Sequence, residues 1–198
     1  MLDACYDTSA VQAAVDLANT LKPVRGEDFL ESVAQLRGFL HDHPALGPAE
    51  PSEPAAEHAT GVRWSPTEED LAEVRSLRET VRAVLERANT DAAGAVALVN
   101  DGLRHSRATP VLRLGDDGWR TEVVSGTDRC SHHLAAAMFS ALASVIATLG
   151  PNRLGACAGP NCRGTFVDLS RNGSKQYCTR ACAHRVSVAA YRSRHNAG

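Results

Sequence analysis

The sequence predicts an α+β protein, with a mostly helical N-terminal domain that contains one β-hairpin and a small cysteine-rich module after it. Three observations lead to this prediction. Apolar residues recur at helical spacing through much of residues 1–150, the spacing becomes strand-like at about 110–124, and four of the six cysteines lie within 157–182. A chain of 198 residues is long enough for one domain and a small appended module. We therefore expect domains at 1–150 and 151–198.

Two helices are expected at the start of the first domain. In residues 9–21, apolar residues fall on one helical face and Ser9 is the candidate N-cap. Residues 28–42 repeat four large apolar side chains at the same spacing. The next stretch, about 43–63, holds four prolines and no apolar period, which predicts a flexible surface loop.

The most clearly patterned helix is SPTEEDLAEVRSLRETVRAVLERA. Ser65 is its candidate N-cap, Pro66 would occupy the first helical position, and acidic residues fill the first turn. An apolar stripe then runs from Leu71 to Leu85. Three arginines, Arg75, Arg78 and Arg82, share another face, which favours a salt-bridged surface.

The rest of the first domain changes period twice. A further helix is expected over 91–105. Residues 111–114 and 119–124 are β-type runs separated by glycines and aspartates, which predicts a hairpin. Residues 129–149 are apolar nearly all round, which indicates a helix buried in the core or in a dimer interface.

Composition and charge narrow the class of function. With 43% apolar and 22% charged residues, the chain is typical of a soluble globular protein. We expect no apolar run as long as a membrane span and no secretory signal, and hence a cytoplasmic protein without membrane contact. The net charge is −2, yet residues 151–198 hold eight Lys/Arg and one acid, which leaves −9 in residues 1–150. This asymmetry predicts that the C-terminal module meets a polyanion.

The cysteines of the module have metal-ligand spacing: Cys157-x4-Cys162-x15-Cys178-x3-Cys182. A reducing compartment disfavours a disulfide framework. Two close pairs joined by a modest spacer suit a tetrahedral ion, so we expect one structural Zn²⁺ per chain. Four sulfur ligands leave no open position for a catalytic water. A thiol switch and unligated cysteines are the alternatives.

The local sequence favours a treble-clef-like zinc finger. Gly159 and Pro160 let the first pair bend around one point. The spacer predicts a hairpin, with a strand at 165–168, a turn at 172–173 and a return strand into Tyr177. Cys182 would then lie in the first turn of a helix, whose dipole favours a thiolate.

That last helix, over 180–195, has a basic side. At 100° per residue, Cys182, Val186, Ala189 and Ala190 face inward with the metal. The outward side holds no acid, and a solvated charged face is the alternative to a DNA contact. The candidate contacts to double-stranded DNA come from the spacer between the cysteine pairs and from this helix. They are Arg171, Lys175, Arg180, His184, Arg185, Arg192 and Arg194.

Several stretches resemble one family, the CGNR zinc-finger proteins with an N-terminal ABATE domain. AAVDLANTL, DFLESVAQLRGFLHDH and the central helix are similar to the ABATE domain, and FVDLSRNG and VAAYRSR are the most specific pieces of the finger. The resemblance implies a zinc-bound, DNA-binding transcriptional regulator whose first domain is a sensor or partner-binding part. Ala183 and His184 stand where the family's naming motif has Gly and Asn.

Other polar residues give weaker signals. Asp16, Asn19 and His133 are candidate contacts to a small-molecule effector, although a polar helix edge or a cap fits the first two equally well. Cys130, His132 and His133 suggest either a second metal site or ordinary helix-start residues. We find no nucleophile–base pair and expect no catalytic residues. We expect a dimer, and the alternative function is a small-molecule-binding protein or enzyme whose zinc is purely structural.

Overall fold

The computed structural model of the chain describes residues 6–22, 24–46, 65–115 and 118–195. The predicted α+β class is confirmed, because the described residues form six α-helices and three antiparallel strand pairs. The helices are α1 (Thr8–Asn19), α2 (Val33–Asp42), α3 (Glu68–Arg87), α4 (Ala92–His105), α5 (Cys130–Leu149) and α6 (Arg180–His195), with 3₁₀ turns η1 (Pro44–Leu46) and η2 (Pro151–Arg153). The pairs are β1 (Leu21–Lys22) with β2 (Glu27–Asp28), β3 (Ala108–Gly115) with β4 (Gly118–Ser125), and β5 (Leu154–Ala156) with β6 (Thr165–Val167).

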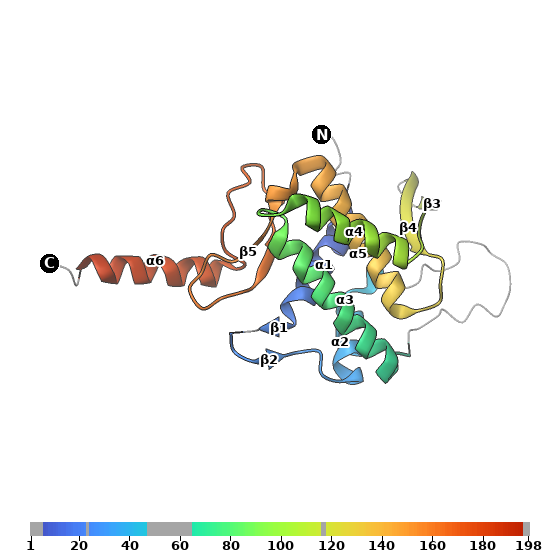
Figure 1. The fold of residues 1–198 in the computed structure, drawn as a ribbon, viewed down its shortest axis with the longest axis horizontal. Coiled ribbons are helices and arrows are strands. Elements are labelled where there is room, and N and C mark those ends of the chain that lie inside the picture. Colours follow the sequence, from blue (N-terminus) through green and yellow to red (C-terminus); the bar gives the residue numbers. More distant parts are fainter. Residues whose placement is uncertain (1–5, 23, 47–64, 116–117, 196–198) are drawn as a thin grey trace.

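Helices α1, α3, α4 and α5 pack together around one apolar core (Figure 1). Helix α5 contributes several large side chains to this core, and Leu134, Met138, Phe139 and Leu142 are fully or almost fully buried. By length and composition α5 could cross a membrane, which corrects the expectation that no apolar run is that long. In the fold this helix packs against α1, α3 and α4.

Helix starts differ from the sequence prediction by a few residues. Helix α3 is capped by Thr67, two residues later than expected, because Thr67 and Asp70 exchange hydrogen bonds as a capping box. Asp7 caps α1 in place of Ser9. Residue 28 belongs to β2, and α2 begins five residues later, after a cap by Ser32. In each case the helix starts after the residue whose side chain accepts a hydrogen bond from a backbone N–H of the first turn.

The expected flexible loop of residues 43–63 lies mostly outside the described residues. Its first part does have structure, since residues 44–46 form η1 and Leu46 is buried in the core. The β3–β4 hairpin agrees with the prediction, with Leu114 opposite Trp119 across the ladder. It packs against α5.

The hairpin predicted inside the cysteine spacer is wrong. Strand β6 pairs with β5, which precedes the first cysteine, and Leu154 lies opposite Val167. Among the described residues 168–179 there is no returning strand. Both strands pack on α3, and Leu154 and Val167 join the apolar core of the N-terminal helices. The finger therefore shares its core with the helical body.

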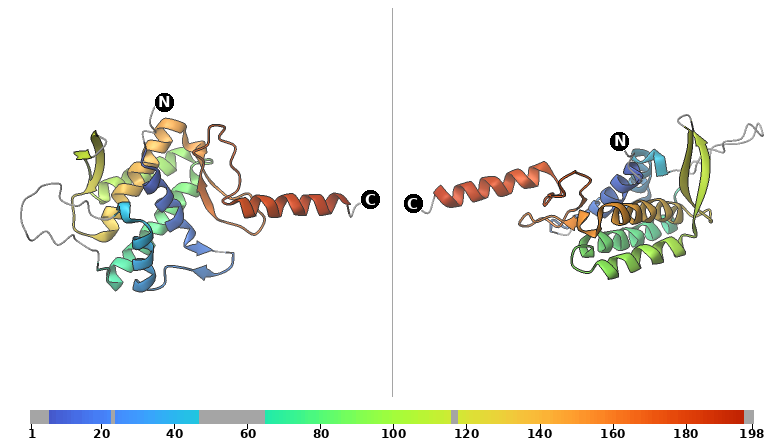
Figure 2. Two further views of the ribbon diagram at one scale, coloured as in Figure 1. Left: turned by 180° about the vertical axis from the view of Figure 1, so that it is seen from behind. Right: turned by 90° about the horizontal axis from the view of Figure 1, so that it is seen from above.

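Helix α6 projects away from the rest of the molecule, as all three views show (Figures 1 and 2). No described element packs extensively along it. The predicted inward side is therefore only partly right: Cys182 is buried, but Val186 is half-buried and Ala189 is exposed. The side chain of Ala190 lies outside those that the structure describes.

Candidate metal centre and its surroundings

The four clustered cysteines come from three parts of the finger. Cys157 follows β5, Cys162 ends a short knuckle, and Cys178 and Cys182 flank the start of α6. Their sulfur atoms all lie within 4.8 Å of one another. The sulfurs of Cys162, Cys178 and Cys182 form a triangle with sides of 3.6 Å.

This spacing fits a tetrahedral zinc ion. Zinc–sulfur bonds of about 2.3 Å place the corners of a tetrahedron about 3.8 Å apart, close to the measured sulfur triangle. The cysteines of this finger can therefore bind one zinc ion, as the sequence predicts. With four protein thiolates as ligands, such an ion stabilises the fold, and no position remains for a reacting water.

The first cysteine pair is shaped by the knuckle between its members. The backbone N–H of Gly159 points at the Cys157 sulfur at 3.4 Å, and Cys162 N donates to Gly159 O at 3.1 Å. Asn161 adopts a left-handed conformation, with φ of 57°, to close this turn. The sulfurs of Cys157 and Cys162 thereby face one point.

The second pair is shaped by the start of α6. Thr179 caps the helix by accepting a hydrogen bond from Cys182 N at 3.2 Å. Arg185, one turn later, donates to the Cys182 sulfur at 2.9 Å. Burial acts to raise the pKa of Cys182, but the hydrogen bonds from Thr179 and Arg185 and from the neighbouring thiols lower it to about 6. Cys182 is thus poised as the thiolate that a metal requires.

The loop after β6 is organised by its one acidic residue. Asp168 is buried, and its carboxylate accepts hydrogen bonds from Ser170 N at 2.9 Å and Lys175 N at 2.7 Å. Burial raises its pKa, but these hydrogen bonds and the charge of Arg153 together bring the pKa below its usual value. Arg153 also donates to the carbonyls of Asp168 and Ser170. The FVDLSRNG stretch therefore folds around Asp168.

Asn19, a candidate effector contact in the sequence, joins the body to the finger. Its side-chain amide donates to Thr165 O at 3.0 Å and accepts from Thr165 N at 2.8 Å. Thr165 is fully buried in β6. The Asn19 amide therefore acts as an added backbone partner for this short strand.

Arg82 makes a second connection, which the sequence analysis missed. Its guanidinium donates to the carbonyls of Ala18 (3.0 Å), Leu21 (3.3 Å) and Arg163. Arg82 and Arg78 are 6% and 3% exposed, so the expectation that they lie on the surface is wrong. The expected ion pairs are present, between Arg78 and Asp28 and between Arg82 and Glu86. Both arginines directly follow apolar residues of the α3 stripe, which was the available signal.

The candidate DNA contacts fall into two groups. The six with a described side chain are all exposed: Arg171, Lys175, Arg180, His184, Arg185 and Arg192. Two of these six also have partners in the finger: Arg185 donates to the Cys182 sulfur, and Lys175 donates to Val167 O at 3.3 Å and lies over the Phe166 ring. The side chain of Arg194 lies outside the described part.

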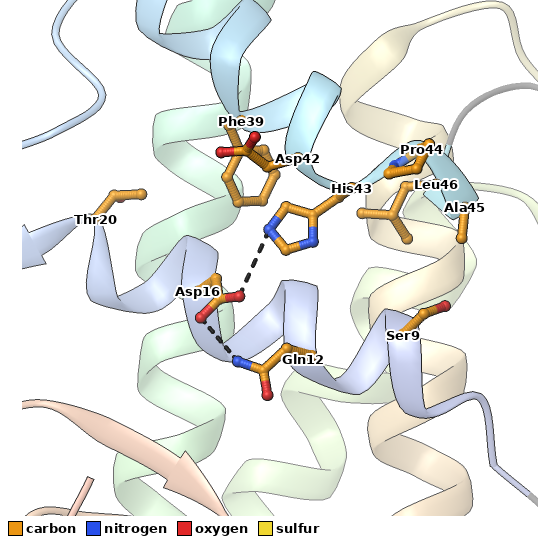
Figure 3. A pocket seen from close by; sticks show the side chains of 10 residues that line it. All are labelled: Ser9, Gln12, Asp16, Thr20, Phe39, Asp42, His43, Pro44, Ala45 and Leu46. Carbon is orange, nitrogen blue, oxygen red and sulfur yellow. Dashed lines mark hydrogen bonds and ion pairs between the residues drawn. The ribbon is translucent and has the colours of Figure 1, made fainter. Parts of the chain in front are cut away.

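Asp16 lies in a pocket of about 610 Å³ between α1 and the α2–η1 segment (Figure 3). Its carboxylate accepts a hydrogen bond from Gln12 at 2.9 Å and lies 3.6 Å from His43 Nε2. The other two candidate effector contacts do not line this pocket: Asn19 binds Thr165, and His133 is half-buried in the first turn of α5.

The start of α5 does not form a second metal site. Among the described residues, only the four clustered cysteines bring three or more ligand atoms close enough for one ion. Burial raises the pKa of Cys130 to about 12, which keeps it a thiol. His132 bonds Thr127 at 3.0 Å and packs edge-on against His105. These residues are therefore ordinary helix-start residues, which was the alternative to a second metal site.

Two family models match the chain, one for each part of the molecule. Residues 12–149 match ABATE, described as "Putative stress-induced transcription regulator", and residues 153–195 match the CGNR zinc finger. A comparison with curated proteins found no match. The matched ranges take in the helical body, all four clustered cysteines and α6. The chain belongs to the ABATE family, and its C-terminal part is a CGNR zinc finger.

Proposed function

We propose that this zinc-finger protein is a DNA-binding transcriptional regulator that lays α6 against double-stranded DNA. The observation that supports this most is that α6 projects from the body (Figure 1) and carries exposed cationic side chains. A helix of 16 residues is about 24 Å long, and the major groove of DNA is wide enough for an α-helix.

The charge of the finger supports the same proposal. Residues 151–198 contain one acidic residue, Asp168, against eight Lys/Arg. Because the carboxylate of Asp168 is buried and bound to backbone N–H groups, it offers little negative charge at the surface. An exposed basic surface without acids favours a polyanion with regularly spaced phosphates.

The roles within α6 are unequal. Arg180 and Arg192 are exposed and supply phosphate contacts in this proposal. Arg185 supports the metal centre through the Cys182 sulfur, and its side chain is also exposed. His184 stands where the family motif has asparagine, and it is the residue that we propose to meet a base edge or a phosphate.

The test is a selection from a random duplex DNA library with zinc-loaded protein, followed by titration of the enriched duplex. We expect the Arg180→Gln/Arg192→Gln double variant to weaken binding and to reduce the slope of log affinity against log salt by about two. Arg104→Gln is the matched control, since Arg104 is exposed on α4. The proposal fails if no duplex is enriched, or if the double variant binds the enriched duplex like the parent protein does.

The proposal includes a cytoplasmic location, where thiolate ligands stay reduced. It also includes a homodimer, because two copies would present two α6 helices to two half-sites, as dimeric DNA-binding proteins commonly do. Sedimentation equilibrium of the protein with and without the enriched duplex measures this state.

In the same proposal the helical body is the sensor. The supporting observation is the pocket at Asp16, which lies on the same helix as Asn19, the residue that holds the finger. The pocket also favours a second candidate function, a ligand-binding protein with a purely structural zinc. Ligand binding by a protein that enriches no DNA would favour that candidate.

A further inference from the structure

The pocket at Asp16 has one polar wall and one largely apolar wall (Figure 3). The polar wall is an edge of α1 that carries Gln12 and Asp16. The opposite wall carries Phe39 and His43, whose rings lie 4.6 Å apart at a tilt of 47°. Leu46, 4% exposed, closes the apolar side.

The charged groups of the pocket are mainly acidic. Asp16 and Asp42 line it, and none of the described lining residues is Lys or Arg. His43 is the one side chain there that can carry a positive charge. A pocket with two carboxylates and no permanent cation attracts a cationic ligand and disfavours an anion.

The Asp16 carboxylate has capacity for another donor. One oxygen, Oδ1, accepts from Gln12 at 2.9 Å. The other, Oδ2, lies 3.6 Å from His43 Nε2, which is longer than a hydrogen bond. The side chain is 43% exposed, so a ligand can reach it from the pocket.

The shape of the donor set favours an organic cation over a metal ion. Within the described residues, the carboxylates and imidazole of this pocket do not bring three ligand atoms close enough to hold one ion. An ammonium group needs only one carboxylate, and the face of Phe39 attracts a cation near the ring. An apolar body of the ligand would be covered by Phe39 and Leu46.

We propose that this pocket binds a small organic amine, with the ammonium on Asp16 and the apolar body against Phe39. The inference gives the sensor role a ligand class and in that respect rests on the proposed function. The inference also suggests how binding in the pocket reaches the finger, through Asn19 and Thr165. Asn19 lies one turn beyond Asp16 on α1, so an amine bound to the Asp16 carboxylate acts on the turn of α1 whose Asn19 side chain holds Thr165.

The experiment is isothermal titration of the full-length, zinc-loaded protein with phenethylamine, agmatine and putrescine. Phenylacetate is the matched probe, because it resembles phenethylamine in size but is an anion. We expect saturable binding of at least one amine, no binding of phenylacetate, and a loss of affinity of about tenfold or more in Asp16→Asn. Asp101→Asn, which changes an exposed carboxylate on α4, should bind like the parent.

A second readout follows the backbone amide of Thr165 by NMR during the titration. We expect its resonance to move with amine saturation in the parent protein and to stay fixed in Asp16→Asn. Three results would overturn the inference: no amine binds at millimolar concentration, Asp16→Asn binds as well as the parent, or the Thr165 resonance does not respond to a bound amine. Neither measurement contains DNA, so their failure is distinct from failure of the DNA-binding proposal.

Discussion

The two halves of the zinc finger are positioned by different interactions. The anchored half, residues 153–178, packs its strands into the core of the helical body and is bonded there by Asn19 and Arg82. The projecting half, α6, has no such support along its length and meets the rest of the molecule at Cys182, whose sulfur lies 3.6 Å from those of Cys162 and Cys178. The metal centre therefore connects a part that is packed into the core with a part that projects from it. This arrangement fixes where α6 starts while leaving its sides open to a partner.

Cys178→Ser at the metal centre should have the largest effect on the structure of the finger. It removes the ligand that lies between the two halves, and structural zinc in small fingers contributes of the order of 10 kcal/mol of binding free energy. We expect loss of zinc and of α6 structure, while α1 to α5 keep their core. Metal analysis, far-UV circular dichroism and limited proteolysis measure these changes.

Cys130→Ala is the control for this substitution, because Cys130 is buried in α5 and lies outside the cluster. It should retain one zinc per chain with an intact finger. Retention of zinc and of protease resistance in Cys178→Ser would contradict the assignment of this ligand.

The anchoring bonds should have the next largest effect. Asn19→Ala leaves the buried N–H and C=O of Thr165 without their partner, and an unsatisfied buried polar group costs about 1–3 kcal/mol. We expect a lower unfolding temperature and faster hydrogen exchange at residues 154–156 and 165–167, with zinc still bound. Exchange measured by mass spectrometry separates this outcome from loss of metal.

Asn100→Ala serves as the control for Asn19→Ala, because Asn100 is exposed on α4. It should change the unfolding temperature little. Equal exchange at Thr165 in Asn19→Ala and in the parent protein would show that apolar packing and Arg82 hold the anchored half without Asn19.

The sequence predicts the parts of this arrangement that depend on local spacing. The four cysteines lie within 26 consecutive residues, so their pairing could be read from their intervals. The Asn19–Thr165 bond joins residues 146 positions apart, and neither residue type signals such a partner. Strand β5 has three residues, which is too short for a period, so its pairing with β6 was missed. Helical periodicity predicted that one side of α6 is covered by the rest of the protein. Periodicity does not show whether any element packs against that side, and none of the described elements packs extensively there.

Arg192 gives the smallest expected effect on stability and the sharpest contrast between the two halves. Arg82 and Arg192 are the same residue type, but Arg82 is 6% exposed and bonds three carbonyls, whereas Arg192 is exposed. Substitution at an exposed surface position usually changes stability by less than about 0.5 kcal/mol. We therefore expect Arg192→Gln to unfold like the parent protein in urea and to bind duplex DNA more weakly. For Arg82→Gln we expect the opposite, a marked loss of stability in urea that exceeds any direct effect on DNA binding. If Arg192→Gln were instead as destabilising as Arg82→Gln, α6 would have to pack against the protein, and its role as a projecting DNA-binding helix would be untenable.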